Sequence, residues 1–334
     1  MHNLISKNEK FFIAGANGMV GSAINKALIE KGYGNQSKGG LILSPSRKDL
    51  DLQNQKDVFN WFKKNQPTVV VICAAKVGGI MANNNSPYEF LIENLKIQTN
   101  IIEASFLNKA KRLLFLGSSC IYPKLSPQPI KEEYLLTGPL EKTNEAYALA
   151  KISGIKLCEK LRYQHRFDVI SAMPTNLYGP KDKYDDLNSH VLPALIKRFH
   201  EAKEKNKEFV HCWGTGKPLR EFLHVDDLAQ ACLFLLENWS PKYEPSEKEA
   251  NLNYLNIGSY DEISIRELAE KISNIVQYKG DIIWDTSKPD GTPRKKLDIS
   301  KIKSLGWEPK IDLDTGLKNT YINFINENIP YTKQ

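Results

Sequence analysis

The sequence contains no apolar stretch long enough to cross a bilayer and too few cysteines to hold a small fold together. Its longest apolar runs, such as residues 69–75, fall short of the roughly 18 residues that a membrane-spanning helix needs. The five cysteines are odd in number, widely scattered and without a Cys-x-x-Cys pair, and no two histidines stand at metal-ligand spacing. These absences argue against a membrane-spanning protein and a disulfide framework, and they predict a chain without a metal site.

Two further absences concern targeting and partners. Residues 1–10 are polar and lack the apolar core of a secretory signal, so we expect a cytoplasmic protein. The net charge of +7 is spread along the chain and forms no concentrated basic stripe with interleaved aromatic residues. A mildly basic balance instead suits a phosphorylated small ligand. We therefore expect neither a membrane nor a nucleic acid as a partner.

The composition is that of a globular protein with one large domain or two smaller ones. Hydrophobic residues make up 41% and charged residues 25% of the 334 residues. At about 150 residues per domain, this length corresponds to two domains or to one large domain with an added lobe. Such a chain can bury a core without disulfide or metal support.

The first half of the chain alternates short apolar strands with helical patterns. The alternation predicts strands over residues 11–14, 41–43, 69–73, 113–116 and 169–172, and helices around 20–28, 58–62, 89–107 and 146–163. This order indicates an α/β protein with a doubly wound parallel sheet and right-handed crossovers, which is the Rossmann-type arrangement.

The second half is less regular. It predicts helices at 191–204, 226–238, 265–277 and 313–325, and short strands near 209–212, 253–257 and 282–284. We interpret these elements as a smaller mixed α/β lobe. Residues 35–40 and 240–250 are polar and predict surface loops.

A glycine-rich turn lies between the first predicted strand and the first predicted helix. Gly15, Gly18 and Gly21 follow the spacing Gly-x-x-Gly-x-x-Gly. Glycine allows the tight turn, a close approach of backbone to phosphate, and packing of helix on strand. The helix N-terminus then offers free N–H groups to a pyrophosphate. In this strand–turn–helix context the motif predicts a dinucleotide site, and no Gly-Lys-Ser/Thr follows that would indicate a Walker A loop.

The stretch after the second predicted strand favours NADP over NAD. Residues 44–48 contain no carboxylate that could hold a ribose 2′-hydroxyl, whereas Arg47 offers a guanidinium to a 2′-phosphate. The alternative is a solvated arginine in a loop. Asp51 and Leu52 follow closely, and we expect them at the edge of the adenine.

A serine, a tyrosine and a lysine predict a site for carbonyl reduction. Ser118 follows a predicted buried strand, at the edge where parallel sheets bind ligands. Tyr147 and Lys151 are four residues apart and share one face of a predicted helix. We expect the ammonium to lower the pKa of the phenol, which then donates a proton to a carbonyl oxygen while hydride reaches the carbon. A solvated Tyr–Lys pair is the alternative, and the glycine turn upstream argues against it.

Together these motifs resemble those of the extended short-chain dehydrogenase/reductases. The likeness extends over nearly the whole chain and includes segments at residues 12–15 with 18–24, 74–80, 116–124, 173–180, 189–191, 220–227 and 288–295. The last four segments are similar to those of one branch of that family. The enzymes of this branch epimerise C3 and C5 of GDP-4-keto-6-deoxy-D-mannose and then reduce C4 to give GDP-L-fucose. The resemblance implies NADP(H) as cofactor, a GDP-linked 4-keto sugar as substrate, and a homodimer.

The resemblance also assigns catalytic roles. It implies that Ser118, Tyr147 and Lys151 form the reductive triad, and that Cys120 and His190 form the epimerising pair. A 4-keto group acidifies the hydrogens at C3 and C5, so a base can form an enolate and an acid can return a proton on the other face. A thiol near deprotonation suits the base, and histidine suits the acid. Without the resemblance, Cys120 would be a small buried hydrophobe and His190 a helix-start histidine.

Binding residues and domain boundaries follow from the same resemblance. The expected cofactor contacts are Gly15, Asn17, Gly18, Met19, Val20, Gly21, Arg47, Asp51, Leu52, Ala74, Ala75, Lys76, Tyr147, Lys151, Pro174, Asn176, Leu177 and His190. The expected sugar-nucleotide contacts are Ser118, Ser119, Cys120, Asn176, Arg198, Trp213, Arg220 and Lys295. Residues 1–175 and about 221–245 would form the NADP-binding domain, and about 176–220 and 246–334 the GDP-sugar-binding domain.

The sequence departs from the family pattern in three places, none of which removes a catalytic group. Asn17 stands where the family often has a basic residue, which leaves Arg47 more isolated as a partner for the 2′-phosphate. Ala146 stands where a proline commonly precedes the tyrosine, and residues 35–40 look inserted.

The motifs leave other functions open. A C4-reductase, with or without epimerase activity, could act on a related GDP-4-keto-6-deoxy sugar such as a heptose, because one hydroxymethyl group alters a pocket wall and no motif. A non-catalytic dinucleotide-binding protein could keep the fold, although such proteins usually lose the tyrosine or the lysine. An RNA-binding role would show itself in retention on RNA with a steep salt dependence.

Overall fold

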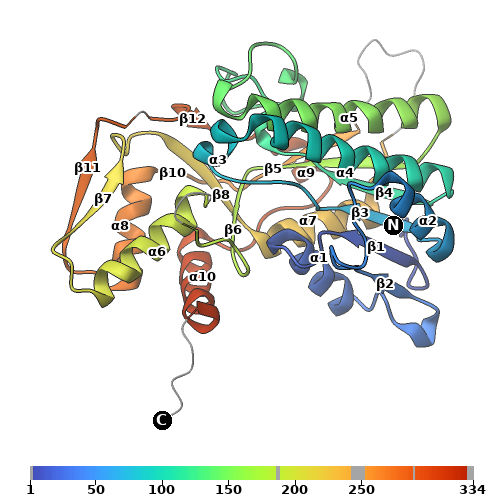
Figure 1. The fold of residues 1–334 in the computed structure, drawn as a ribbon, viewed down its shortest axis with the longest axis horizontal. Coiled ribbons are helices and arrows are strands. Elements are labelled where there is room, and N and C mark those ends of the chain that lie inside the picture. The colour runs from blue at the N-terminus through green and yellow to red at the C-terminus, as the bar shows by residue number, and fades with distance from the viewer. Residues whose placement is uncertain (1–2, 186–188, 242–252, 289, 329–334) are drawn as a thin grey trace.

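A computed structural model describes residues 3–185, 189–241, 253–288 and 290–328, and its centre is a six-stranded parallel sheet. The strands are β1 (Lys10–Ala14), β2 (Leu41–Leu43), β3 (Val69–Ile72), β4 (Arg112–Leu116), β5 (Val169–Pro174) and β9 (Tyr254–Ile257). Their order across the sheet is β2-β1-β3-β4-β5-β9 (Figure 1). The direction of chain progression reverses between β1 and β3, and such a switch point is where open α/β sheets form their ligand crevice.

Helices cover both faces of this sheet. On one face α4 (Pro87–Leu107) packs between α5 (Glu145–His165) and α2 (Gln55–Asn65). On the opposite face α1 (Met19–Glu30) packs against α7 (Val225–Asn238) (Figure 1). Because neither face meets water, every residue of β3 and β4 is buried and the strands show no polar alternation.

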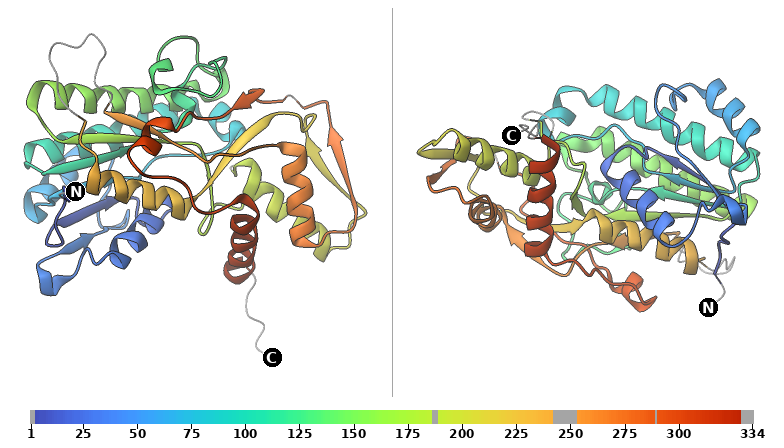
Figure 2. Two further views of the ribbon diagram at one scale, coloured as in Figure 1. Left: turned by 180° about the vertical axis from the view of Figure 1, so that it is seen from behind. Right: turned by 90° about the horizontal axis from the view of Figure 1, so that it is seen from below.

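A smaller mixed lobe lies at one end of the sheet, as Figure 2 shows from two further sides. Its centre is β8 (Leu219–His224), which pairs with β10 (Glu262–Ser264) in the antiparallel sense and with β6 (Asn176–Tyr178) and β12 (Arg294–Lys295) in the parallel sense. A separate parallel pair is formed by β7 (Phe209–Trp213) and β11 (Asp281–Asp285). The helices of this lobe are α6 (Val191–Glu204), α8 (Ile265–Val276) and α10 (Leu313–Asn328).

Short helices connect these elements. They are α3 (Ile80–Asn85), α9 (Ser300–Ser304) and the 3-10 helices η1 (Gln36–Lys38), η2 (Ser119–Ile121), η3 (Glu132–Tyr134) and η4 (Lys142–Asn144). The two lobes have separate apolar cores. The larger core joins the six-stranded sheet to its helices, and the smaller one packs residues such as Leu195, Phe199 and Leu268 between α6 and α8.

The predicted fold class is confirmed: a Rossmann-type doubly wound parallel sheet carries a smaller mixed α/β lobe. One strand lies elsewhere than the predicted domain division assumes. Residues 246–334 were assigned to the second domain, but β9 joins the large sheet because its side chains are buried and its backbone pairs with β5. The rest of the domain division stays a prediction.

Several short elements were not predicted from the sequence. The strands β6, β10 and β12 span only two or three residues each, too few for a period to be recognised. The strand β8 is longer, but Arg220 and Glu221 stand in its middle and conceal its buried character.

The predicted loop at residues 35–40 is exposed apart from Gly40 and contains η1. Of the predicted loop 240–250, residues 242–250 lie outside the described part of the chain. Within the described residues, no helix combines the length and apolar character required to span a membrane.

Truncation of the central strand should destabilise the protein strongly. Leu114 is fully buried in the middle of β4, so Leu114→Ala leaves a cavity and should lower the free energy of unfolding by about 2–5 kcal/mol. Leu125 is 81% exposed, and Leu125→Ala should change it by no more than about 0.5 kcal/mol. Urea denaturation of both variants measures the difference. Equal losses would show that Leu114 does not belong to a tightly packed core.

Candidate active site

The glycine turn lies between β1 and α1 at the carboxyl edge of the sheet. Gly15 has a φ of +83°, and a Cβ on it would come within 2.8 Å of the backbone nitrogen of Ala74. A Cβ on Gly21 would lie 2.2 Å from the carbonyl oxygen of Gly15. The N-cap of α1 is Gly18, which has no side chain to accept hydrogen bonds from the first turn, and that turn contains no acidic residue. The N–H groups and positive dipole end of α1 are therefore suited to an anion such as a pyrophosphate.

The segment after β2 forms an exposed turn. Ser46 donates a hydrogen bond of 2.6 Å from its hydroxyl to Asp49, and Arg47 projects from this turn with an exposed side chain. Asp51 is exposed, while Leu52 is half-buried and its carbonyl accepts a hydrogen bond from Asn100. A guanidinium in this position can reach an anionic ligand without a desolvation cost.

The chain that follows β3 is fastened from α4. The Asn94 amide accepts a hydrogen bond of 2.8 Å from the backbone nitrogen of Lys76 and donates one of 3.0 Å to its carbonyl oxygen. The ammonium of Lys76 forms an ion pair of 2.5 Å with Glu93. Ala74, Ala75 and Lys76 are thus held at the same sheet edge as the glycine turn, where the sequence predicts the cofactor.

The serine, the tyrosine and the lysine of the predicted triad lie together. Ser118 follows β4, and its hydroxyl hydrogen-bonds to the phenol of Tyr147 on α5. Lys151 lies one turn further along α5, with its Nζ 5.8 Å from the centre of the Tyr147 ring. The ammonium donates a hydrogen bond of 2.8 Å to the carbonyl oxygen of Leu116 and lies 4.9 Å from the centre of the Phe115 ring.

The protonation states differ from the sequence expectation. We expected Lys151 to lower the pKa of the Tyr147 phenol. In the structure that pKa is raised, first because the phenol is desolvated and then because of Cys120, and the Ser118 hydrogen bond opposes the rise only in part. Burial also lowers the pKa of Lys151 to about 8. The phenol is therefore protonated near neutral pH, which is the form that can donate a proton.

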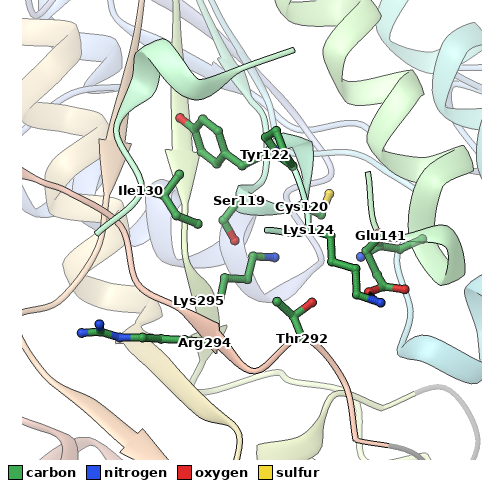
Figure 3. A pocket seen from close by; sticks show the side chains of 11 residues that line it. Ser119, Cys120, Tyr122, Lys124, Ile130, Glu141, Thr292, Arg294 and Lys295 are labelled. Carbon is green, nitrogen blue, oxygen red and sulfur yellow. Dashed lines mark ion pairs between the residues drawn. The ribbon is translucent and has the colours of Figure 1, made fainter. Parts of the chain in front are cut away.

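Cys120 lies beside the triad and faces a small cavity of about 30 Å³ (Figure 3). The backbone nitrogen of Cys120 donates a hydrogen bond of 3.4 Å to the Ser118 hydroxyl. Lys295 extends from β12 in the other lobe toward Ser119 and Cys120 (Figure 3). Burial raises the pKa of the Cys120 thiol, and the positive charge of Lys295 is the strongest influence against that rise.

His190 immediately precedes α6, and its surface is more exposed than that of Cys120. Its pKa is lowered, first because the surrounding protein desolvates the imidazole and then because Lys295 and Lys183 are positively charged. Lys295 thus acts on both members of the predicted epimerising pair. Residues 186–188, which lead to His190, lie outside the described part of the chain.

The predicted sugar-nucleotide contacts fall into two groups. Arg198 and Trp213 line a second cavity of about 620 Å³ between α6 and β7, and Arg198 donates a hydrogen bond of 2.7 Å to the His211 carbonyl. Asn176 and Arg220 belong to the paired strands β6 and β8, nearer to Lys295. Pro174 is the last residue of β5, and Leu177 is the middle residue of β6. Both therefore lie at the junction of the two lobes.

Some residues around Cys120 were not predicted as site residues. The further lining residues of its cavity are Tyr122, Pro123, Lys124, Ile130, Glu141, Asn144, Thr292 and Arg294. Lys124 and Glu141 form an ion pair of 2.8 Å at one side of the cavity (Figure 3). Thr292 and Arg294 belong to the segment 288–295, in which the sequence singled out only Lys295. Their polarity alone does not distinguish them from surface residues.

The glycine turn, the Ser118–Tyr147–Lys151 triad and the two-lobed fold together identify the family. A model of the NAD dependent epimerase/dehydratase family matches residues 11–248. The chain belongs to this family. GDP-L-fucose synthase 1 of Arabidopsis thaliana is 54% identical over 319 residues, which cover 96% of this chain and 94% of the relative. GDP-L-fucose synthase of Escherichia coli (strain K12) is 48% identical over 321 residues, which cover 95% and 97%.

Solved structures agree with this assignment. A GDP-6-OMe-4-keto-L-xylo-heptose reductase from C. jejuni matches with a TM-score of 0.90 at 35% identity and covers 97% of this chain and 99% of its own. MlghC, a GDP-mannoheptose C4 reductase from Campylobacter jejuni solved with NADP bound, matches with a TM-score of 0.85 at 37% identity and covers 96% and 99%. The predicted resemblance to the extended short-chain dehydrogenase/reductases is confirmed, as is the prediction of an enzyme that uses a nicotinamide dinucleotide.

The family's dinucleotide site should depend on the close approach within the glycine turn. Because a Cβ at residue 21 would lie 2.2 Å from the Gly15 carbonyl oxygen, Gly21→Ala should displace the turn and weaken NADPH binding by about tenfold or more, which corresponds to about 1.4 kcal/mol. Gly32 has φ +78° and open space around it, so Gly32→Ala should cost about 1–2 kcal/mol of stability and leave NADPH affinity unchanged. Calorimetric titration compares the two, and equal affinities would contradict the prediction.

Proposed function

We propose that this chain converts GDP-4-keto-6-deoxy-D-mannose to GDP-L-fucose by epimerisation at C3 and C5 followed by NADPH-dependent reduction at C4. The observation that supports this most strongly is the position of Ser118. Its hydroxyl contacts both the Tyr147 phenol and Cys120, so a proton donor for a carbonyl oxygen lies next to a thiol that can act on the adjacent carbons. The names of relatives that are about half identical to this chain agree with both activities.

In the reductive step Tyr147 donates its phenolic proton to the C4 oxygen. NADPH supplies the hydride to C4 when it is bound. Ser118 orients the phenol by a hydrogen bond, and the ammonium of Lys151 favours transient negative charge on the phenol oxygen. The hydrogen bond from Lys151 to Leu116 keeps this charge in place 5.8 Å from the centre of the phenol ring.

In the epimerising step Cys120 removes the proton from C3 or C5, and the electrons of the broken C–H bond move into an enolate on the C4 oxygen. The Tyr147 and Ser118 hydroxyls stabilise that oxygen. His190 returns a proton to the opposite face of the same carbon. The lowered pKa of His190 and the raised pKa of Cys120 favour the neutral forms of both groups. The thiol proton must therefore pass to the His190 imidazole before each cycle, which gives the thiolate that takes the C–H proton and the imidazolium that returns one. The positive charge of Lys295 favours loss of the proton from sulfur.

We place the GDP group against the second lobe, the domain predicted over about residues 176–220 and 246–334. Arg198 and Arg220 would pair with the diphosphate, Trp213 would lie against the ligand, and Lys295 and Asn176 would complete the contacts. The 620 Å³ cavity between α6 and β7 offers room for a flat base next to the 53% exposed ring of Trp213. We further propose that exposed Arg47 binds the 2′-phosphate of NADP, with Asn17 in the glycine turn beside it.

A C4-reductase acting on a GDP-4-keto-heptose is the second candidate. It is favoured by the solved relatives, since both Campylobacter reductases cover nearly all of this chain at TM-scores of 0.85 and 0.90. Such an enzyme would use Ser118, Tyr147 and Lys151 in the same way. It differs from the first candidate in whether it also exchanges the hydrogens at C3 and C5.

We also propose that the enzyme is a cytoplasmic homodimer. The adjacent helices α4 and α5 lie side by side on the outside of the large domain (Figure 1). They expose apolar side chains, including Leu107 and Leu149. A second copy could cover this pair of helices. Light scattering on the purified chain measures the mass of the assembly.

The epimerase activity predicts incorporation of solvent deuterium. In D₂O the enzyme should place deuterium at C3 and C5 of GDP-4-keto-6-deoxy-D-mannose, as measured by NMR of the product. Cys120→Ser should lower this incorporation by about 100-fold or more, because removal of a positioned acid–base group typically costs 10²–10⁴-fold. Tyr147→Phe should lose NADPH oxidation but keep a slower exchange, because the Ser118 hydroxyl still stabilises the enolate oxygen. Reduction without any exchange at C3 and C5 would instead support the heptose-type C4-reductase.

The pH dependence of reduction should report Lys151. Its ammonium is present below its pKa of about 8 and is lost above it, so the rate of NADPH oxidation should fall as the pH rises through about 8. Tyr147 should not cause this alkaline limb of the pH–rate profile, because burial raises the pKa of its phenol further from neutrality. Lys151→Arg keeps the charge at high pH, so the limb should disappear even if the variant is slower. A limb unchanged by Lys151→Arg would assign it to another group.

A further inference from the structure

The carboxylate of Glu221 is buried at the junction of the two lobes. It lies on β8, beside Arg220, and none of its surface is exposed. One carboxylate oxygen accepts a hydrogen bond of 2.7 Å from the backbone nitrogen of Ser259, just after β9, and the other accepts one of 3.0 Å from the backbone nitrogen of Leu297, just after β12. Thr175 also hydrogen-bonds to the side chain. One residue thus ties the end of the large sheet to the chain that returns from the second lobe.

That returning chain, residues 294–298, is called the return segment below. On the side away from Glu221 it is held by a loop of the large domain. Ile130 donates a hydrogen bond of 2.7 Å to the carbonyl of Lys296 and accepts one of 2.8 Å from the backbone nitrogen of Asp298. The side chain of Gln128 accepts one of 2.9 Å from the backbone nitrogen of Lys296. The return segment is therefore fixed in register between this loop and β8.

Lys295 is the residue of the return segment that reaches the reactive groups. Its backbone pairs with Arg220 on β8, and its side chain lines the cavity that Cys120 faces (Figure 3). The positively charged groups that act on the Cys120 thiol are Lys295 and, more weakly, Lys151, and Ser118 hydrogen-bonds to it. Any shift of the return segment moves the stronger of these two charges.

We propose that Glu221 is a positioning residue that fixes the return segment against β8 and thereby holds the Lys295 ammonium beside Cys120. The proposal rests on the proposed role of Cys120 as the epimerising base, but the placement of Lys295 is measurable without any substrate. Glu221 itself touches neither the cavity nor Cys120 among the described residues.

A purely structural role would be the simplest alternative, and Asp227 provides the matched comparison. Asp227 is 4% exposed, and one of its oxygens accepts hydrogen bonds of 3.0 and 2.8 Å from the backbone nitrogens of Lys310 and Ile311. It therefore resembles Glu221 in burial and in the number of backbone N–H groups that it binds. The chain that it holds does not line the Cys120 cavity. Replacement of either carboxylate by its amide removes the charge that strengthens these hydrogen bonds. At Glu221 it also turns the NH2 group toward one of the two N–H groups.

The carboxylate lies against Gly258. A Cβ on Gly258 would lie 2.3 Å from one oxygen of Glu221, so Gly258→Ala pushes the carboxylate without removing it. Burial raises the pKa of Glu221 to about 7, against the lowering effect of the two backbone N–H groups. The tests below are made at pH 8, where the wild-type carboxylate carries its charge.

The test measures the reactivity of the Cys120 thiol in the intact protein. Alkylation by iodoacetamide is followed at pH 8 by mass spectrometry of the peptide that contains Cys120. If Lys295 is displaced and the thiol pKa rises by one unit, the thiolate fraction and the alkylation rate fall about tenfold. We expect this fall in Glu221→Gln and in Gly258→Ala. We expect no change in Asp227→Asn, although urea denaturation should show that both carboxylate variants are destabilised.

A double-mutant cycle separates an effect through Lys295 from a general loosening of the site. Lys295→Met should by itself slow the alkylation of Cys120 to a similar extent. Glu221→Gln added to Lys295→Met should then slow it no further, because the charge that Glu221 positions is already absent. If the two substitutions in the double variant slow the alkylation of Cys120 by the product of their separate effects, the proposal is overturned. It is also overturned if Asp227→Asn slows the alkylation as much as Glu221→Gln does.

Failure of the proposed function gives a different pattern. If Cys120 is not the epimerising base, alkylation still falls in Glu221→Gln while deuterium exchange at C3 and C5 stays at the wild-type rate. If both proposals hold, the rate of deuterium exchange falls in Glu221→Gln. The acidic limb of the pH–rate profile for exchange then moves about one pH unit upward, by the same amount as the pKa of the Cys120 thiol. An unchanged alkylation rate in both Glu221→Gln and Gly258→Ala would show that Glu221 does not position Lys295.

Discussion

A lysine ammonium with almost no exposure to water determines where the reactive groups of this chain lie. Lys151 is 3% exposed, and an ammonium in such a place requires a partner because its hydration is lost. The Leu116 carbonyl at the end of β4 and the face of the Phe115 ring provide it. These contacts fasten α5 to the end of β4. Tyr147 on α5 therefore lies against Ser118, which follows β4 in the chain.

The second constraint is that the other lobe must supply part of the same site. The large domain carries the glycine turn, the triad and Cys120, whereas Lys295 comes from the return segment that runs back from the second lobe. Backbone hydrogen bonds to Ile130 and Glu221 hold that segment on both sides. The charge that opposes the high pKa of Cys120 is thus contributed across a domain junction, at a point where small shifts of register have large electrostatic effects.

Burial is the largest influence on the pKa of each reactive residue, and neighbouring charges oppose it only at Cys120 and Lys151. Desolvation raises the pKa of Tyr147 and of Cys120 and lowers that of Lys151 and His190, so each group is moved toward its neutral form. A neutral phenol is ready to donate a proton. A neutral thiol is not ready to accept one. Burial therefore keeps the Tyr147 phenol in its donating form, whereas loss of the proton from the Cys120 thiol depends on a specific positive neighbour.

The sequence by itself determined the elements whose patterns are local. The apolar strands of the large sheet, the glycine turn and the four-residue spacing of Tyr147 and Lys151 follow from short-range periodicity and backbone geometry, and the structure contains them. It did not determine the short strand β12, the pairing of β9 with β5, or the direction in which the pKa of Tyr147 moves. These depend on which distant segments exclude water from a group and which charges they bring near it. Only the tertiary structure decided that Glu221 binds the backbone of Leu297 and that Lys295 lies beside Cys120, because those contacts join residues far apart in the chain.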